Sequence, residues 1–179
     1  MKKLLVISFV LASAHSSGQS FVQGIVSRLS VGVKAGANYS DYVHADFKTD
    51  PLIGFHAGGI VNFRCTQQLS VQEEFLFSSQ GAKIADVDRK VYYLTVPILL
   101  KYRTNLGLYF EAGGQTGMRL HEDVEGLAKQ LDFGAAAGLG YQSKMGLGFG
   151  VRYVAGVSKA GMSGDFRSGV AQGSVFYIF

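Results

Sequence analysis

The chain is poor in cysteine, proline and charge, and it lacks any long apolar run. Its one cysteine, Cys65, cannot form an internal disulfide and belongs to no cluster that could hold zinc or an iron–sulfur centre. No stretch approaches the ~18 to 20 apolar residues of a membrane-spanning helix, so a helical membrane protein is excluded. Removing Lys2 and Lys3 with a leader would leave 15 of the 17 basic residues against 13 acidic ones, so the net charge would fall from +4 to +2. This charge is too weak to indicate nucleic acid as a partner.

Glycine is the residue in excess. There are 24 glycines among 179 residues, which is about twice the usual share of ~7%. The hydrophobic share of 47% is that of a folded chain and excludes general disorder. The length suits one domain or one membrane barrel.

The N-terminus has the order of residues found in a secretory signal peptide. Two lysines come first, then the apolar stretch 4–14, which ends in a small-x-small cleavage pattern. We predict a signal peptide within residues 1–19, cleaved after Ala14, with Gly18 and Gln19 as alternative sites. The other interpretation is a buried first strand or short helix. With a leader, the mature protein would leave the cytoplasm.

From Leu29 onward, apolar residues recur at every second position, which is the period of a strand with two different faces. The pattern predicts eight strands, near residues 29–40, 52–63, 69–80, 91–102, 106–120, 131–141, 146–157 and 169–179. Ordinary strands average about 5 or 6 residues, whereas these have about 11 to 15, enough for a tilted strand to cross a bilayer. We therefore expect one domain over residues 29–179.

The two faces of these strands differ in residue type. Aromatic residues gather on the apolar faces, with Tyr93, Tyr109 and Phe176 as the exceptions. Most glycines lie on the opposite faces together with the strand charges, and Glu73 is the one charge on an apolar face. A lipocalin-like soluble barrel would turn its apolar face inward, and a transmembrane barrel would turn it outward.

Three features favour the transmembrane barrel. Glycine weakens a solvent-facing strand but fits a narrow interior that must hold a few long polar side chains. Many aromatic residues stand near strand ends, as interfacial girdles require. The expected connections alternate between roughly ten residues and about three to five, as external loops and periplasmic turns do. We predict an all-β, eight-stranded antiparallel up-and-down barrel in the outer membrane of a Gram-negative bacterium, with both termini periplasmic.

Seven stretches between Val31 and Phe179 carry a resemblance to a known family. They are Gly-Val-Lys-Ala-Gly-Ala-Asn-Tyr-Ser (32–40), Gly-Phe-His-Ala-Gly-Gly (54–59), Leu-Ser-Val-Gln-Glu-Glu-Phe-Leu-Phe-Ser-Ser-Gln-Gly-Ala-Lys (69–83), Tyr-Leu-Thr-Val-Pro-Ile-Leu-Leu-Lys-Tyr (93–102), Phe-Glu-Ala-Gly-Gly-Gln (110–115), Asp-Phe-Gly-Ala-Ala-Ala-Gly-Leu-Gly-Tyr (132–141) and Arg-Tyr-Val-Ala-Gly-Val (152–157). In their order and spacing the chain resembles the PorT-like small outer-membrane β-barrel proteins. This resemblance implies an eight-stranded outer-membrane barrel but no single activity; the protein that gives the family its name serves type IX protein secretion. Where the family usually has proline, this chain has Glu73, which indicates a local bulge or a position near the membrane interface.

The last residues form a second recognisable pattern. Aromatic or apolar residues occupy alternate positions up to the final phenylalanine. Tyr177 and Phe179 therefore resemble the signal that the outer-membrane assembly machinery reads. The alternative is a buried last strand that ends in phenylalanine by chance.

Four charged residues are expected at one level inside the barrel: Lys34, Glu74, Glu111 and Arg152. Each lies about five or six residues from the periplasmic end of its strand and points to the lumen, and residues rise ~3.3 Å along a strand. Unpaired charges in a narrow interior are costly, so we expect an ion-pair network that plugs the lumen. Structural filling is the favoured role, and gating or proton relay is the functional alternative.

Other motifs are weaker. His56 also faces the lumen, but no Gly-x-Ser-x-Gly motif or spaced triad accompanies it, which favours a satisfied interior histidine. The oxygen-rich segment 121–125 could bind a cation or simply be solvated. The glycines of 146–150 alternate along a strand face and form no phosphate loop. Cys65 is expected to be a reduced or incidental thiol in a short turn.

These observations predict a non-enzymatic protein without cofactor or metal, with an envelope-structural or surface-contact role and a lumen plugged by side chains. The expected partners are outer-membrane lipid, the outer-membrane assembly machinery and periplasmic chaperones, and no nucleic acid. The alternative function, which the family resemblance allows, is an accessory component of a type IX secretion system, with secretion-system proteins as partners. An outer-membrane enzyme acting on lipid is the third hypothesis, disfavoured because no catalytic constellation is visible.

Overall fold

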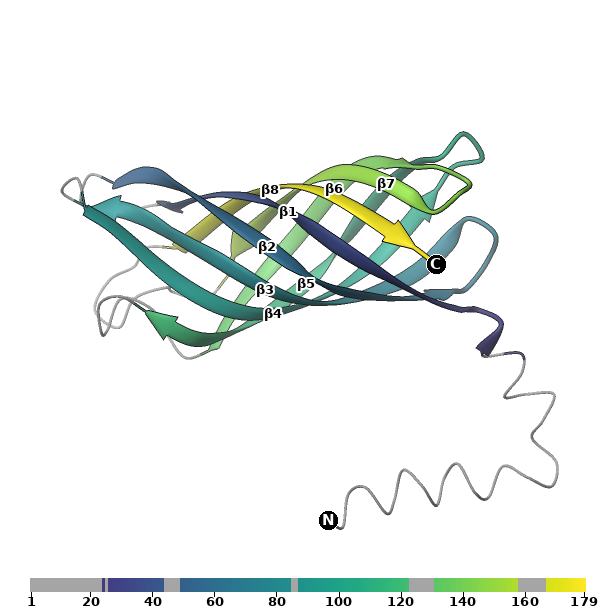
Figure 1. Ribbon diagram of the computed structural model, residues 1–179, viewed down its shortest axis with the longest axis horizontal. Helices are drawn as coiled ribbons and strands as arrows, with labels where there is room; N and C mark the ends of the chain where they lie inside the picture. The colour runs from purple at the N-terminus through teal and green to yellow at the C-terminus, as the bar shows by residue number, and fades with distance from the viewer. Residues whose placement is uncertain (1–23, 25, 44–48, 85–86, 123–130, 158–166) are drawn as a thin grey trace, which may run out of the picture.

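The computed structural model describes residues 24, 26–43, 49–84, 87–122, 131–157 and 167–179. Within them, eight strands form one closed barrel in which each strand pairs antiparallel with the next and the last pairs with the first (Figure 1). The strands are β1 (Leu29–Val43), β2 (Thr49–Arg64), β3 (Leu69–Ile84), β4 (Val87–Arg103), β5 (Leu108–Glu122), β6 (Leu131–Gln142), β7 (Leu147–Gly156) and β8 (Arg167–Ile178). The eight-stranded antiparallel barrel predicted from the alternation is confirmed.

The largest departure from the expected strands lies between β3 and β4. The sequence pattern predicts a connection of roughly ten residues at 81–90, but the two strands continue through it to Ile84 and Val87, which pair with each other. This expectation is wrong because backbone hydrogen bonding extends the hairpin beyond the point where apolar alternation stops. Among the described residues, no helix is long and apolar enough to cross a membrane.

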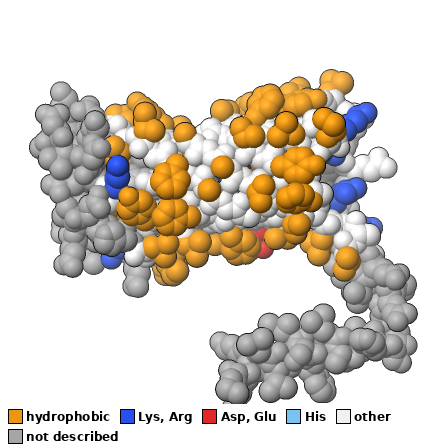
Figure 2. Space-filling model, viewed as in Figure 1, with side chains coloured by type: hydrophobic (Ala, Val, Ile, Leu, Met, Phe, Trp, Pro, Cys, Tyr) orange, Lys and Arg blue, Asp and Glu red, His pale blue; other side chains and the backbone are white. Residues whose placement is uncertain are grey.

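The apolar faces assigned from the sequence are the outer surface of the barrel. Outward-facing Ile53 and Phe149 are 72% and 60% exposed, whereas inward-facing charges are buried. Figure 2 shows apolar side chains distributed over the visible wall. This arrangement confirms the transmembrane interpretation over the lipocalin-like one, because a soluble barrel would bury this surface.

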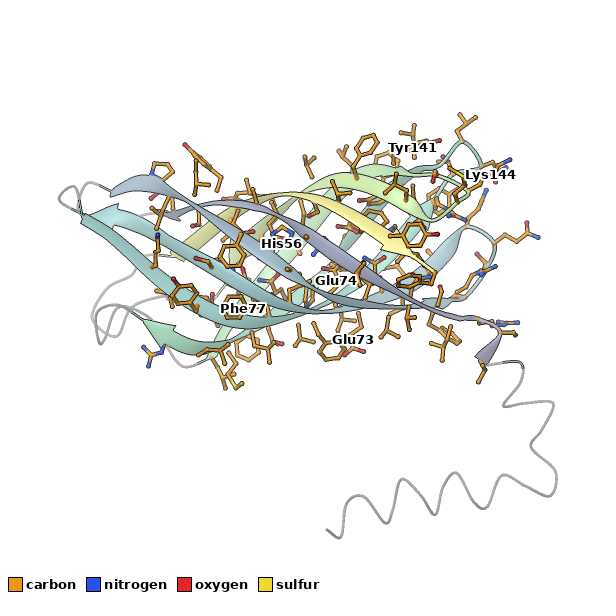
Figure 3. The ribbon with its side chains drawn as sticks, viewed as in Figure 1. His56, Glu73, Glu74, Phe77, Tyr141 and Lys144 are labelled. Carbon is orange, nitrogen blue, oxygen red and sulfur yellow. The ribbon has the colours of Figure 1, made fainter. Side chains whose placement is uncertain are left out.

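Aromatic rings pair on the outer surface at both ends of the barrel. Toward one end, Phe77 packs against Phe55 and Tyr92, with ring centroids 5.9 and 5.8 Å apart (Figure 3). At the other end, Tyr141 packs against Phe149 at 5.9 Å. Aromatic belts at two heights are typical of a barrel whose two rims meet the membrane–water interfaces.

Three short turns lie at one end of the barrel, at residues 65–68, 104–107 and 143–146. We call this end, where β1 also begins and β8 ends, the turn end. Gly107 and Gly146 each have a φ of 95°, a conformation that favours glycine over other residues. Backbone bonds join the turns to one another and to the two chain ends at this rim: Arg64 N to Arg28 O at 2.9 Å, Arg103 N to Gln68 O at 2.8 Å, Gln142 N to Gly107 O at 2.8 Å, Ile178 N to Gly146 O at 3.0 Å and Phe179 N to Val31 O at 2.8 Å. The rim at the turn end is therefore a closed, hydrogen-bonded ring.

Glu73 stands in a regular part of the sheet. It pairs in register with Val61 on β2 and Ile98 on β4, and its side chain points outward (Figure 3). The register shifts in the barrel lie elsewhere, near 51–56 and at 92–93. Of the two explanations for this carboxylate, the bulge is therefore wrong.

Candidate functional site

The four charged residues singled out in the sequence meet inside the barrel. Lys34 of β1 donates to both carboxylate oxygens of Glu74 on β3, at 3.1 and 3.2 Å. Arg152 of β7 donates from Nη1 and Nη2 to the same two oxygens at 2.8 and 2.7 Å, and from Nε to Glu111 Oε1 on β5 at 2.7 Å. All four side chains are at most 5% exposed. One guanidinium thus joins two carboxylates across the lumen, which is the forked geometry in which charge-assisted hydrogen bonds are strongest.

Two further residues extend this network, and sequence reasoning did not include them. Gln72 donates to Glu74 Oε1 at 2.7 Å and accepts from Lys101 Nζ at 3.2 Å. The Lys101 ammonium also lies over the rings of Tyr109 and Phe176, 4.0 and 4.5 Å from their centroids. Gln72 lies two residues from Glu74 on β3, so the alternation of the strand already places both side chains on the inner face. We call the six residues Lys34, Gln72, Glu74, Lys101, Glu111 and Arg152 the ionic layer.

Apolar clusters lie on both sides of the ionic layer. Ile60, Tyr109 and Phe176 pack together with Ile178 on the side of the turn end. Leu99, Ala136, Val154 and Val170 form a second buried cluster. Along β5, counted from the turn end, Tyr109 precedes Glu111, and along β7 Val154 follows Arg152. Lys34, Glu74, Glu111 and Arg152 therefore lie between two apolar plugs: the turn-end plug of Ile60, Tyr109, Phe176 and Ile178, and the far plug of Leu99, Ala136, Val154 and Val170.

Glycine makes room for the bulky members of the turn-end plug, Tyr109 and Phe176. A Cβ atom on Gly150 would collide with the hydroxyl of Tyr109, and one on Gly148 would collide with the ring of Phe176. These positions show why glycine shares the inward face with the charges: a narrow lumen can hold large side chains only where the opposite wall has none.

His56 belongs to a separate polar group. Its Nδ1 lies 2.7 Å from Asn38 Oδ1, and its Nε2 lies 3.0 Å from Ser174 Oγ. Asn38 directs its amide nitrogen toward Ser78 and backbone carbonyls, which leaves its oxygen for the imidazole. With neutral histidine, Nδ1–H then donates to Asn38, and the Ser174 hydroxyl donates to Nε2.

Ser174, His56 and Asn38 form a chain of hydrogen bonds that has the outline of a hydrolase triad, although no motif in the sequence marks it. The three residues come from β8, β2 and β1, and strand pairing brings them together although the sequence separates them widely. His56 is 1% exposed, and the barrel wall encloses it. The arrangement therefore links three strands and satisfies both ring nitrogens, and it offers no open face to a substrate.

The remaining candidate residues lie at the surface or outside the described residues. Tyr177 and Phe179 point outward, with ring centroids 5.2 Å apart, and Phe179 N donates to Val31 O at 2.8 Å. Cys65 is a free, half-buried thiol in the first short turn. Residues 123–125 of the suggested cation-binding segment are not among those described. Among the described residues, no three His, Cys, Asp or Glu side chains are grouped closely enough to hold a metal ion.

Comparison with known protein families identifies the architecture. The model of the outer membrane protein beta-barrel domain matches residues 14–160. The chain belongs to this family. The match is to the broad outer-membrane family and does not single out the PorT-like group. The chain has no significant match among curated protein sequences.

Solved structures show the same barrel. Ail, the attachment invasion locus protein of Yersinia pestis, is similar with a TM-score of 0.55 and 17% identity, over 84% of this chain and 98% of that one. Neisserial surface protein A is similar with a TM-score of 0.55 and 16% identity, over 84% and 97%. Ail has also been solved in complex with the heparin analogue sucrose octasulfate. At these identities the likeness establishes the fold: this family member is an outer-membrane β-barrel protein.

Proposed function

We propose that this protein is a closed, non-enzymatic barrel of a Gram-negative outer membrane, with both termini periplasmic and a structural or surface-contact role. The observation that carries the proposal is the ionic layer held between two apolar plugs. Such an interior supports the barrel and leaves no open route for ions or substrates.

The geometry of the ionic layer favours structural filling over gating or proton relay. Both oxygens of Glu74 are bonded to two cations, and Arg152 uses three nitrogens on two carboxylates. Opening a pore would separate these buried charges, and an unpaired charge in a low-dielectric interior is costly. We therefore interpret the layer as a fixed plug.

Single-channel recording in planar bilayers tests the plug. We expect the wild-type protein to show no stable conductance. Glu111→Ala removes one carboxylate from Arg152 and should produce intermittent openings, whereas the matched outer-surface change Glu73→Ala should not. A large, stable conductance in the wild-type protein would overturn the proposal.

The natural cysteine tests the orientation. Cys65 lies in a short turn, which we place in the periplasm. A maleimide carried on a polymer too large to cross the outer membrane should label Cys65 only after the cells are permeabilised. A Cys65→Ser variant with a new cysteine within residues 123–130 should be labelled in intact cells. The reverse pattern would show that the turn end faces outward.

An accessory role in type IX secretion is the second candidate, supported by the resemblance of the seven sequence stretches to PorT-like proteins.

A deletion strain separates the candidates. Sensitivity to detergent with normal export supports the structural role, and loss of binding to other surfaces supports the contact role. Lost export of secreted proteins supports the accessory role, and altered lipid chemistry would indicate an enzyme instead.

A further inference from the structure

The two ends of the barrel differ in charge. Each short turn or its flanking residue carries one cation, Arg64, Arg103 or Lys144, and none of the three turns contains Asp or Glu. Among the described residues, no carboxylate forms an ion pair with these three cations. On the face shown in Figure 2, basic side chains gather at the turn end without acidic ones. Charge at this end is therefore available to an external anion.

The opposite end has charges of both signs. Lys90 and Arg119 occur there with Asp41 and Asp132 on the described strand ends. An anion meets acidic and basic side chains at that end, whereas the three short turns and their flanking residues carry charged side chains of positive sign only, and the acidic group beside them is the carboxylate of Phe179. The difference indicates that any anion selectivity of the barrel belongs to the turn end.

A cavity of about 450 Å³ lies between the second and third short turns. Arg103 and Lys144 both line it, together with polar Gln142 and Asn105 and apolar Leu106 and Tyr141. An adjoining cavity of about 420 Å³ shares Arg103, Lys144 and Gln142 and reaches inward to Lys101. Two cations and two hydrogen-bonding amides in the lining of one cavity form a suitable setting for a phosphate group.

The walls of this cavity are fixed before any ligand arrives. Gln142 N donates to Gly107 O at 2.8 Å, which joins the two turns directly. Within the second turn, Gly107 N donates to Thr104 O at 3.0 Å, and within the third, Gly146 N donates to Ser143 O at 3.2 Å. Binding therefore requires little ordering of the backbone, which favours affinity.

The apolar lining indicates what kind of anion the cavity fits. Leu106 is 80% exposed and lines the cavity with Arg103, and Tyr141 is an outward-facing ring that packs against Phe149 at the turn end, near Lys144 (Figure 3). An inorganic anion would use the cations and leave this apolar surface in contact with water. A phospholipid would use both, with its phosphate between the cations and its glycerol and acyl chains against Leu106 and Tyr141.

We propose that the cavity between the second and third short turns binds the headgroup of an anionic phospholipid from the adjacent leaflet. Arg103 and Lys144 hold the phosphate, and Leu106 and Tyr141 hold the apolar part. The inference rests on the proposed orientation, with the turn end at the periplasmic leaflet, and does not depend on whether the lumen conducts. A lipid bound here would fix the turn end at the phospholipid surface.

Native mass spectrometry of the purified, folded barrel tests this site. The probes are phosphatidylglycerol, phosphatidylcholine with the same acyl chains, and inorganic phosphate. We expect wild-type protein to retain phosphatidylglycerol in preference to phosphatidylcholine. Each of Arg103→Gln and Lys144→Gln should weaken this retention about fivefold, the effect of one cation near a membrane surface. The matched change Lys90→Gln, at the opposite end, should leave it unchanged.

A second variant distinguishes a lipid site from a simple anion site. Leu106→Gln keeps both cations and should reduce retention of phosphatidylglycerol without changing competition by inorganic phosphate. Equal retention of the two lipids, or a preference that survives the double change Arg103→Gln and Lys144→Gln, would refute the proposal. So would displacement of the lipid by inorganic phosphate at equal concentration. Circular dichroism and heat-modifiable migration of each variant establish that it is folded, and bilayer recordings read the lumen separately.

Discussion

Glu73 and Glu74 are neighbours in the chain and have opposite surroundings. Glu74 is fully buried and bonded to Lys34 and Arg152, whereas Glu73 lies outside between Val61 and Ile98 (Figure 3). In the described part of the chain, no hydrogen bond or ion pair involves the Glu73 carboxylate. The period of two in a strand places the same functional group in two different solvents. Position relative to the wall, rather than residue type, therefore decides what each carboxylate contributes.

The same contrast runs through the whole barrel. The inner face supplies partners for its charges: two carboxylates pair with Lys34 and Arg152, and Lys101 is bonded to Gln72 and lies over two aromatic rings. Lipid can supply no such partner to the outer face, and that face is apolar almost throughout. Substitutions on the inner face should therefore change the free energy of unfolding through lost partners or lost space. Substitutions on the outer face should change it mainly through the transfer of the side chain between water and lipid.

The largest effect is expected for Glu74→Ala. This change leaves the ammonium of Lys34 without a carboxylate and removes two bonds from Arg152. Breaking one side of a buried ion pair costs about 3–5 kcal/mol. Urea unfolding of the barrel in lipid vesicles should show this loss in the free energy of unfolding. The adjacent change Glu73→Ala is the control, and equal losses for the two variants would contradict the contrast between the faces.

Gly150→Val should have the next largest effect. Its side chain would occupy the space that the Tyr109 hydroxyl now fills, and such overpacking costs about 1–3 kcal/mol. Gly114→Val is the outer-face control, because Gly114 lies on the exposed side of β5 and a Cβ there meets nothing within 4 Å. The same unfolding measurement compares the two variants. A similar loss at both positions would contradict overpacking of the lumen as the cause of the Gly150→Val effect.

Much of this barrel is readable from sequence because a two-sided strand imposes its period directly on residue type. That period identified the eight strands and the lipid-facing parity, and it set Lys34, Glu74, Glu111 and Arg152 on the inner face. The contacts of His56 with Ser174 and Asn38 could not be predicted in this way, because they depend on the register between neighbouring strands. The extension of β3 and β4 was missed for a related reason: backbone bonding needs no apolar pattern.

The cations of the turn end were hidden from sequence reasoning for another reason. Arg103 and Lys144 are separated by about 40 residues in the chain, and the pairing of β5 with β6 places their turns next to each other. Each turn contributes one unremarkable basic residue, so no local motif marks the site. The sequence feature that marks the site is the absence of acidic residues from all three turns. This feature indicates a basic rim only when the three turns are known to lie at the same end of the barrel.

Glu73→Val should produce the smallest effect, and one of opposite sign. Valine continues the apolar surface formed by Val61 and Ile98, and it removes a carboxylate that must be desolvated or protonated at the lipid face. The free energy of unfolding should rise by roughly 1 kcal/mol, less than the cost of a central cation on that face. The gain should increase in vesicles of longer acyl chain, because thicker hydrocarbon surrounds the carboxylate more completely. A loss of stability instead would mean that the Glu73 carboxylate has a bonding partner on the lipid side. Charges on the outer face would then be stabilised by partners, as those in the interior are.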